Sequence, residues 1–189
     1  MSNIFILFSP LDNSNNSGII DLDLSGCNFS GLYTANWFAE KCPNLETVDL
    51  RNATIGGTYN VTLVSAFSNC PKLTKFDGTG MTIKSAKTSS MFAGDSLLEE
   101  VYLPNLTASS SYNISGMYNG CSSLRIIDMR SFDFSLINKS STGQHSYVFK
   151  DVPNDCLIIV KNTASKNWIT SLWSNLTNVK TVSEYEASL

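Results

Sequence analysis

Cysteine is the residue type in this sequence whose spacing first suggests chemistry. It recurs in a short phrase that reads KCPNL at 41–45, NCPKL at 69–73 and GCSSL at 120–124, with an aspartate in its place in GDSLL at 94–98. The zinc-site spacing Cys-x-x-Cys is absent, and no histidine lies near these cysteines in the sequence. We therefore expect Cys42, Cys70 and Cys121 to be buried free thiols, with a disulfide between Cys42 and Cys70 as the alternative.

Asp95 and His145 are the other isolated candidates for a chemical role. Asp95 occupies the cysteine slot of GDSLL, which indicates a turn position where a small side chain bonds to the local backbone. The single histidine, His145, lies in the polar stretch STGQHSY, and the sequence has no GxSxG nucleophile elbow. We expect a solvated loop histidine, and we predict no catalytic residue, no metal ligand and no cofactor.

Paired carboxylates offer one further chemistry, because polysaccharide-cleaving enzymes use two carboxyl groups about 5 to 9 Å apart. Asp49 and Asp77 would meet that distance if they stood on neighbouring strands. Any two stacked acids would do so, which makes an enzyme the least favoured of our functional hypotheses.

The elements that must position these side chains follow from an internal repeat. Aligning the cysteine phrase places five copies on anchors separated by 26, 28, 25 and 26 residues, and a degenerate step of 31 residues leads to Val152. The anchors are Asn16, Cys42, Cys70, Asp95 and Cys121. The regular spacing indicates one structural unit used about five times.

Each copy carries the same apolar pattern, which starts three residues after its anchor. The second copy reads Leu45, Val48, Leu50, Ala53 and Ile55, and the first copy reads Ile19, Leu22, Leu24, Cys27 and Phe29. Among the 25 such slots, only Gly78 lacks a side chain that can fill a core. Spacing by two is the period of a short strand with one buried face, so stacked copies predict a parallel sheet.

We therefore expect an α/β repeat solenoid, in which each copy borrows its core from its neighbours. An aromatic residue closes the polar stretch of each copy, and these residues predict a stacked column opposite the sheet: Phe38, Phe67, Phe92, Tyr118 and Phe149. Trp37 is expected to begin this column. Trp168 and Trp173 are expected to cover the exposed end of the apolar stack.

The outward side of the predicted strands is the best candidate for a binding surface. It collects eight of the sixteen acids against four bases, and Asp23, Asp49, Asp77, Tyr102 and Asp128 share one register. Stacked like charges repel unless bases compensate them. The candidate binding residues are Asp23, Glu46, Asp49, Arg51, Lys75, Asp77, Glu100, Tyr102, Arg125, Asp128 and Arg130. The alternative is a solvated sheet face that binds nothing.

The repeat resembles the bacterial leucine-rich repeats of the BspA type. The matching stretches are MFAGDSLLEEVYLPN at 91–105 and MYNGCSSLRIIDM at 117–129, and the tail at 156–182 is similar to the cap that closes such arrays. The resemblance, over roughly 19–182, implies a right-handed leucine-rich-repeat solenoid with short helical or turn segments opposite the sheet. It also implies use in adhesion, host contact or recognition, by cell-surface proteins or phage tails.

Composition sets the remaining expectations. The net charge of −3 argues against nucleic acid or an anionic membrane as partner, and no apolar run reaches the length of a membrane span. Ser, Thr and Asn make up about a third of the chain, which suits an extracellular protein, although the apolar run at 4–8 is too short for a signal peptide.

We expect an N-terminal segment at 1–18, about five repeats at 19–151 and a C-terminal cap at 152–189. The favoured function is non-catalytic recognition of a host or bacterial surface protein or glycan. The alternative is a purely structural virion component that forms a homo-oligomer.

Overall fold

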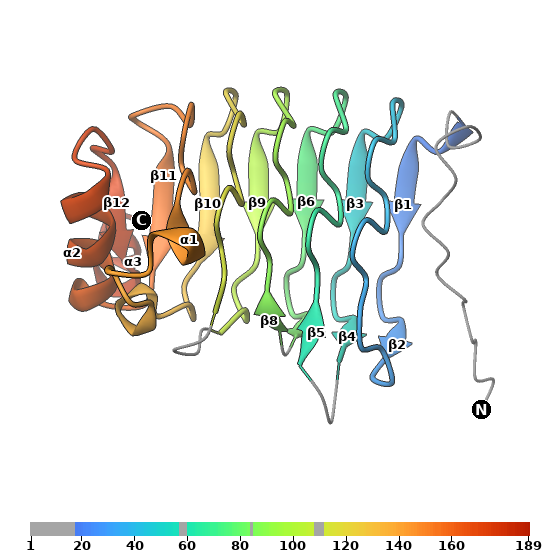
Figure 1. Ribbon diagram of the computed structural model, residues 1–189, viewed down its shortest axis with the longest axis horizontal. Coiled ribbons are helices and arrows are strands. Elements are labelled where there is room, and N and C mark those ends of the chain that lie inside the picture. Colours follow the sequence, from blue (N-terminus) through green and yellow to red (C-terminus); the bar gives the residue numbers. More distant parts are fainter. Residues whose placement is uncertain (1–17, 57–59, 84, 108–111) are drawn as a thin grey trace.

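The chain has an α/β architecture built on an open parallel sheet, with few helices (Figure 1). The computed structural model describes residues 18–56, 60–83, 85–107 and 112–189. The predicted N-terminal segment, apart from Gly18, and the core slot Ala108 lie outside the described residues.

The main sheet has seven strands, all paired in parallel. In spatial order they are β1 (Asp21–Asp23), β3 (Thr47–Asp49), β6 (Lys75–Asp77), β9 (Glu100–Tyr102), β10 (Ile126–Met129), β11 (Leu157–Val160) and β12 (Val179–Thr181). Spatial order follows sequence order, so each predicted copy contributes one strand and the next copy lies beside it.

Two smaller parallel sheets accompany the main sheet. One contains β2 (Asn28–Phe29), β4 (Thr54–Ile55) and β7 (Thr82–Ile83), and the other pairs β5 (Val61–Thr62) with β8 (Ser85–Lys87). The two-residue strands β2, β4 and β7 each follow a main-sheet strand. The second half of the apolar pattern in the first three copies is therefore also stacked.

Helices are short and gather toward the C-terminal end (Figure 1). They are a 3-10 helix η2 (Phe134–Leu136), α1 (Thr142–His145), α2 (Thr163–Leu172) and α3 (Val182–Glu186). Asn162 caps α2 by accepting a hydrogen bond from the Ser165 amide. Among the described residues, no helix has the length and apolar character needed to cross a membrane.

The predicted core slots of the second to fifth copies are buried wherever they are described. They are Leu45, Val48, Leu50, Ala53 and Ile55; Leu73, Phe76, Met81 and Ile83; Leu98, Val101, Leu103 and Leu106; and Leu124, Ile127, Met129, Phe132 and Phe134. The first copy differs, because Ile19, Leu22, Leu24, Cys27 and Phe29 are only partly buried. Among the described strands, β1 has a neighbour on one side only, which accounts for the difference.

Gly78, the one core slot without a side chain, has a steric explanation. A Cβ atom built on Gly78 would lie 2.8 Å from the backbone oxygen of Tyr102 and 3.2 Å from the methyl carbon of Met81. The Gly78 amide donates a hydrogen bond to that same Tyr102 oxygen, over 2.8 Å. The equivalent amides of Leu24, Leu50 and Leu103 make the same 2.8 Å bond, so it is the close Cβ contact, and not the bond, that disfavours a side chain at 78.

The predicted aromatic column forms, with one shift in the second copy. Phe67, Phe92, Tyr118 and Phe149 stack with centroids 5.8 to 6.1 Å apart and planes within 15° of parallel. Phe38 instead meets Phe67 edge-on, at 86°.

The backbone explains this shift. The Ala39 amide donates a hydrogen bond to the Ala66 oxygen in the same way that the Phe67 amide donates to the Met91 oxygen. Ala39, and not Phe38, therefore occupies in the second copy the position that Phe67 occupies in the third. The prediction that Trp37 begins the column is wrong, because Trp37 is 48% exposed at a φ of 58°.

The C-terminal end of the core is covered by α2. Trp168 is 3% exposed and donates its indole N–H to the Ile137 oxygen over 3.0 Å, and Trp173 packs edge-on against Phe149. His145 is part of this cluster, 5.4 Å from the Trp168 ring, and its Nε2 lies 3.0 Å from the Lys139 oxygen. The prediction of a solvated loop histidine is therefore wrong: the ring fills space beneath the two tryptophans.

Candidate functional site

The predicted row of outward residues is in register across five strands. Asp23 pairs with Asp49, Asp49 with Asp77, Asp77 with Tyr102, and Tyr102 with Asp128. A one-residue slip would turn this row into the core. The buried row formed by Leu22, Val48, Phe76, Val101 and Ile127 fixes the alignment of the charged one.

The four aspartates of the row have a structural role that the sequence analysis missed. Each carboxylate accepts a hydrogen bond from the backbone amide two residues later, with N···O distances of 2.9 to 3.1 Å. The pairs are Asp23 with Ser25, Asp49 with Arg51, Asp77 with Thr79, and Asp128 with Arg130. These aspartates form Asx turns that end the strands, which accounts for their recurrence without a ligand.

Tyr102 is the exception in the row, and the sequence explains why. The residue two positions later is Pro104, which has no backbone N–H to donate. An aspartate at 102 could not form the turn made in the other copies. The tyrosine is therefore the one member of the row that does not cap the turn after its own strand.

Two of the aspartates are neutralised within their own copies. Arg51 Nη2 lies 2.6 Å from Asp49 Oδ2, and Arg130 Nη2 lies 2.6 Å from Asp128 Oδ2. Each arginine also donates from Nε to the same carboxylate. The Arg51 guanidinium lowers the pKa of Asp49 despite the opposing effect of burial. The predicted compensation of the acidic row is therefore partly internal to each copy.

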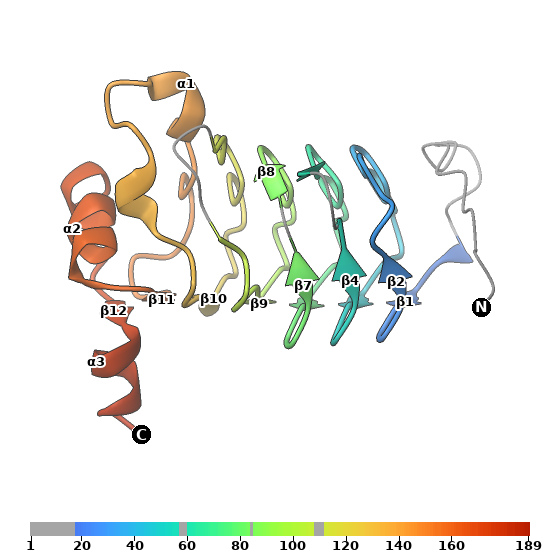
Figure 2. The same cartoon turned by 90° about the horizontal axis from the view of Figure 1, so that it is seen from below.

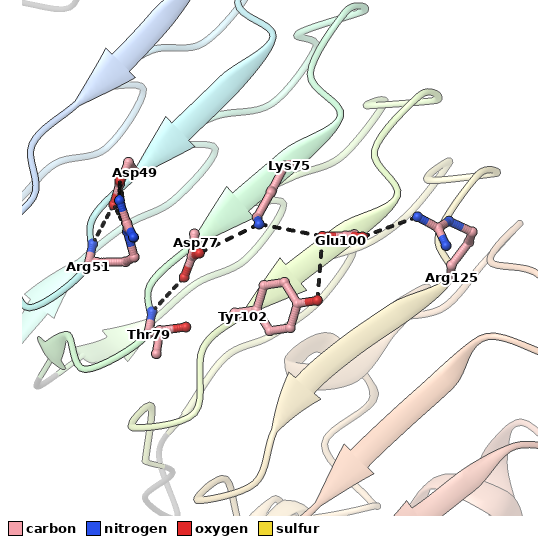
Figure 3. Close-up of polar contacts among 8 residues, drawn as sticks. All are labelled: Asp49, Arg51, Lys75, Asp77, Thr79, Glu100, Tyr102 and Arg125. Atoms are coloured by element: carbon pink, nitrogen blue, oxygen red, sulfur yellow. Dashed lines mark hydrogen bonds and ion pairs between the residues drawn. The ribbon is translucent and has the colours of Figure 1, made fainter. Parts of the chain in front are cut away.

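The central part of the face joins neighbouring copies through ion pairs (Figure 3). Lys75 Nζ lies 3.7 Å from both Asp77 Oδ2 and Glu100 Oε2, and Arg125 Nη2 lies 3.1 Å from Glu100 Oε1. Glu99, which was not among the candidates, also pairs with Arg125, over 2.9 Å. The structure thus brings together Lys75, Asp77, Glu100 and Arg125 around one strand, β9.

Tyr102 lies within this cluster, half-buried on β9. Its ring centroid is 5.5 Å from Lys75 Nζ, and its hydroxyl lies 3.4 Å from Glu100 Oε2. Partial burial, and then the Glu100 charge, raise the pKa of the Tyr102 hydroxyl, so it stays a neutral hydrogen-bond donor at physiological pH. We call Lys75, Glu100, Tyr102 and Arg125 the central cluster.

Asp23 and Glu46 lie apart from the central cluster, at the N-terminal side of the face. Neither takes part in an ion pair with a described residue, and Asp21 likewise has none. The Asp21 carboxylate accepts a hydrogen bond from the Thr47 hydroxyl over 2.6 Å. The face is therefore balanced in charge near β9 and acidic near β1.

The opposite side of the face ends at α3. This helix packs against β11 and β12, and Figure 2 shows it standing out from the sheet beside β12. Ile159, which pairs with Asp128 in the outward row, is fully buried as a result. The open part of the face therefore comprises β1, β3, β6 and β9. On β10, Asp128 is only 4% exposed beneath its pair with Arg130, so the prediction that Asp128 is an exposed binding residue is wrong.

The anchor positions agree with the prediction at the three cysteines and differ from it at Asp95. Cys42, Cys70 and Cys121 are buried free thiols, as predicted. Cys70 and Cys121 donate from Sγ to backbone oxygens of the preceding copies, Ala39 at 3.1 Å and Phe92 at 3.0 Å. Among the described residues, no group of three His, Cys, Asp or Glu side chains is arranged to hold a metal ion.

The prediction that Asp95 bonds to its local backbone is wrong. It is fully buried, and its Oδ1 accepts a hydrogen bond from the Cys70 amide in the neighbouring copy over 2.7 Å. Its Oδ2 has no hydrogen-bond partner among the described atoms. Burial raises the pKa of Asp95 well above its usual value and so favours the neutral acid, although the hydrogen bond from the Cys70 amide acts in the opposite direction.

Comparison with known proteins found no match to this chain. No family model fits the sequence, and neither a curated protein nor a solved structure is significantly similar to it. The resemblance to BspA-type repeats therefore stays a prediction from the sequence.

Proposed function

We propose that this chain is a non-catalytic recognition and adhesion module that binds a protein or glycan through the open sheet face. The observation that carries the proposal is the central cluster. At Tyr102 the requirement for a turn-forming aspartate is absent, and an aromatic side chain lies among Lys75, Glu100 and Arg125. Aromatic and arginine side chains contribute most of the affinity in many interfaces, and tyrosine also stacks on sugar rings.

The finer fold belongs to the same proposal: a right-handed leucine-rich-repeat solenoid of the BspA-like type. Its support is the agreement between the 25-to-28-residue spacing and the order of the main-sheet strands. Such repeats present side chains at fixed spacing on a rigid surface, which suits recognition. The polar, charge-poor composition supports an extracellular setting, on a cell surface or a phage tail.

An enzyme is the weaker reading because of the charges around the acids. A glycosidase needs a general acid whose pKa is raised, whereas Arg51 lowers the pKa of Asp49. Asp77 is likewise within 3.7 Å of the Lys75 ammonium. Because both acids are held in ion pairs and the pKa of Asp49 is lowered, the Asp49 and Asp77 pair is better suited to supporting the surface than to proton transfer.

A purely structural, self-associating role also has less support. Across the central cluster the charged groups are paired within the chain and face solvent, and α2 covers the C-terminal end of the core. Sedimentation equilibrium tests the alternative directly. A stable oligomer whose formation depends on the central cluster would favour it over recognition of a partner.

Binding of the chain to a glycan array and to intact cells tests the recognition proposal. Tyr102→Ala should weaken binding at least tenfold, as expected for an interfacial aromatic anchor. Tyr147→Ala is the matched control, since Tyr147 is an exposed tyrosine two residues after α1, and α1 lies on the side of the molecule away from the main sheet (Figure 2). Equal binding by wild type and the Tyr102 variant, or equal losses in both variants, would contradict the proposal.

A further inference from the structure

The open edge of β1 has backbone groups that no described strand uses. The Ile20 oxygen accepts a hydrogen bond from the Glu46 amide, and the Leu24 amide donates to Asp49, so Ile20 and Leu24 face β3. Alternate residues of a paired strand direct their backbone groups to opposite sides. The amides and carbonyls of Asp21 and Asp23 therefore point to the outer edge, where no described strand pairs with β1.

The same edge is apolar beneath its charged surface. Ile20 is 51% exposed, and Leu22, Leu24 and Phe29 pack against the core while keeping part of their surface accessible. A strand added beside β1 would bury these side chains, as β3 buries those of its neighbours. Unpaired edges of this kind are templates for strand addition.

Charge identifies what kind of strand fits. Asp21 and Asp23 flank Leu22 on the outward side and have no ion-pair partner among the described residues, unlike Asp49 and Asp128. The Ser25 amide lowers the pKa of Asp23, which keeps it ionised. An added strand with lysine or arginine at its outward positions would place opposite charges beside both carboxylates.

Two other segments that could pair with the β1 edge, residues 1–17 of the same chain and β1 of a second copy, lack the basic side chains that this edge favours. Residues 1–17 contain one acid, Asp12, and neither lysine nor arginine. A second copy that paired its own β1 against this β1 would bring Asp21 and Asp23 against identical acids, and like charges directly opposite are unfavourable.

We propose that the β1 edge binds an extended, basic segment of a partner protein, which adds a strand to the main sheet. Backbone hydrogen bonds to Asp21 and Asp23 would hold the segment, and alternate apolar side chains would cover Leu22 and Leu24. Its lysine or arginine side chains would pair with the two carboxylates. This site is separate from the central cluster and does not depend on the proposed function of that cluster.

The probe is a nine-residue peptide that alternates lysine with valine, with blocked ends, added to the full chain. Amide hydrogen exchange should slow at Asp21 and Asp23 on addition of the peptide, and binding should weaken as salt concentration rises. The double variant Asp21→Asn with Asp23→Asn should bind about tenfold more weakly, from two exposed charge pairs. Asparagine at 23 keeps an oxygen that can accept the hydrogen bond from Ser25.

The matched control is Asp151→Asn with Asp155→Asn, two exposed acids near the other end of the chain, which should leave peptide binding unchanged. Tyr102→Ala should also leave it unchanged, so failure of this inference is distinguishable from failure of the proposed function. Equal protection by a peptide with glutamate in place of lysine would overturn the charge argument.

Three other outcomes would overturn the proposal. Slow exchange at Asp21 and Asp23 without peptide, at every protein concentration, would mean that the chain itself occupies the edge. Protection that grows with protein concentration alone would mean that a second copy occupies it. Unchanged exchange on addition of saturating basic peptide would mean that the edge takes no strand.

Discussion

The two ends of the main sheet are closed to very different degrees. At the C-terminal end, β12 is followed directly by α3, and α2 places Trp168 and Ile169 over the last turns of the core, both nearly inaccessible. At the N-terminal end, Ile20 and Trp37 are about half exposed and β1 lacks an outer neighbour among the described strands. The same apolar pattern therefore gives full burial in one place and partial burial in the other.

The difference shows that the repeat pattern does not by itself provide burial. A copy buries its apolar face only when a neighbour or a cap lies on each side of it. The cap is also tied to the last repeat by polar contacts, since Asp133 accepts hydrogen bonds from the Ser165 hydroxyl and the Asn162 amide group of the α2 segment. We found no equivalent of Asp133 among the described residues at the N-terminal end.

Removing a tryptophan at each end should give the largest contrast. Trp168→Ala should destabilise the chain by about 3–5 kcal/mol, because it empties a buried aromatic site and leaves the Ile137 oxygen without its donor. Trp37→Ala should cost clearly less, about 1–2 kcal/mol, since Trp37 already has about half of its surface in water. Urea denaturation of both variants measures the contrast, and equal losses would contradict the account of the two ends.

The hydrogen bonds of Asp133 should provide a smaller contrast. Asp133→Ala should cost about 2 kcal/mol at pH 7, since it removes the bonds from Ser135, Ser165 and Asn162. Asp23→Ala, which removes a single bond from the Ser25 amide at the exposed end, should cost less.

The Asp133 contribution should also depend on pH in a known direction. Burial would raise the pKa of Asp133, but the hydrogen bonds from Ser135, Ser165 and Asn162 outweigh it and lower the pKa. A lowered pKa in the folded state adds stability above about pH 4, the unfolded value, and this stability is lost as pH falls through the folded value. The gap between wild type and Asp133→Ala should therefore narrow in acid, and a constant gap from pH 7 to pH 3 would contradict the assignment.

Substitution of Asp95, which lies between the two ends of the sheet, is expected to have the smallest effect on stability. Asp95→Cys should stabilise the chain by about 1 kcal/mol at pH 7, because it replaces a buried carboxyl that has one unpartnered oxygen with the thiol found in neighbouring copies. The raised pKa of Asp95 means that wild-type stability falls as pH rises above about 4, toward the folded value.

The Asp95→Cys variant lacks this pH dependence, so its advantage should grow with pH. Urea denaturation of both proteins under reducing conditions, from pH 4 to pH 8, measures the gap. An advantage that is the same at both limits would show that Asp95 is not held as the neutral acid.

The strands and the core were predictable because the apolar spacing is local and repeats several times. The row from Asp23 to Asp128 was placed correctly, since a strand period of two leaves no freedom once Val48 and Phe76 are assigned to the core. The column of Phe67, Phe92, Tyr118 and Phe149 was predictable for the same reason.

The errors occurred where a contact joins segments with no shared pattern. His145 is buried by Trp168 and Trp173, which lie more than twenty residues further along the chain. Asp95 bonds to a neighbouring copy rather than to its own turn, and only the stacked structure shows that contact. The Asx turns were within reach of the sequence, because Asp recurs at the strand ends and Pro104 coincides with its one replacement.

Pro104 has a consequence for how this surface can diversify. Where an aspartate ends a strand, a mutation of that aspartate changes the surface and also removes the hydrogen bond that its carboxylate accepts from the backbone. Selection for folding therefore disfavours such mutations. At Tyr102 the proline has already removed that constraint, and substitutions there alter the surface at little folding cost. A library randomised at this position should therefore retain more folded members than one randomised at Asp49 or Asp77.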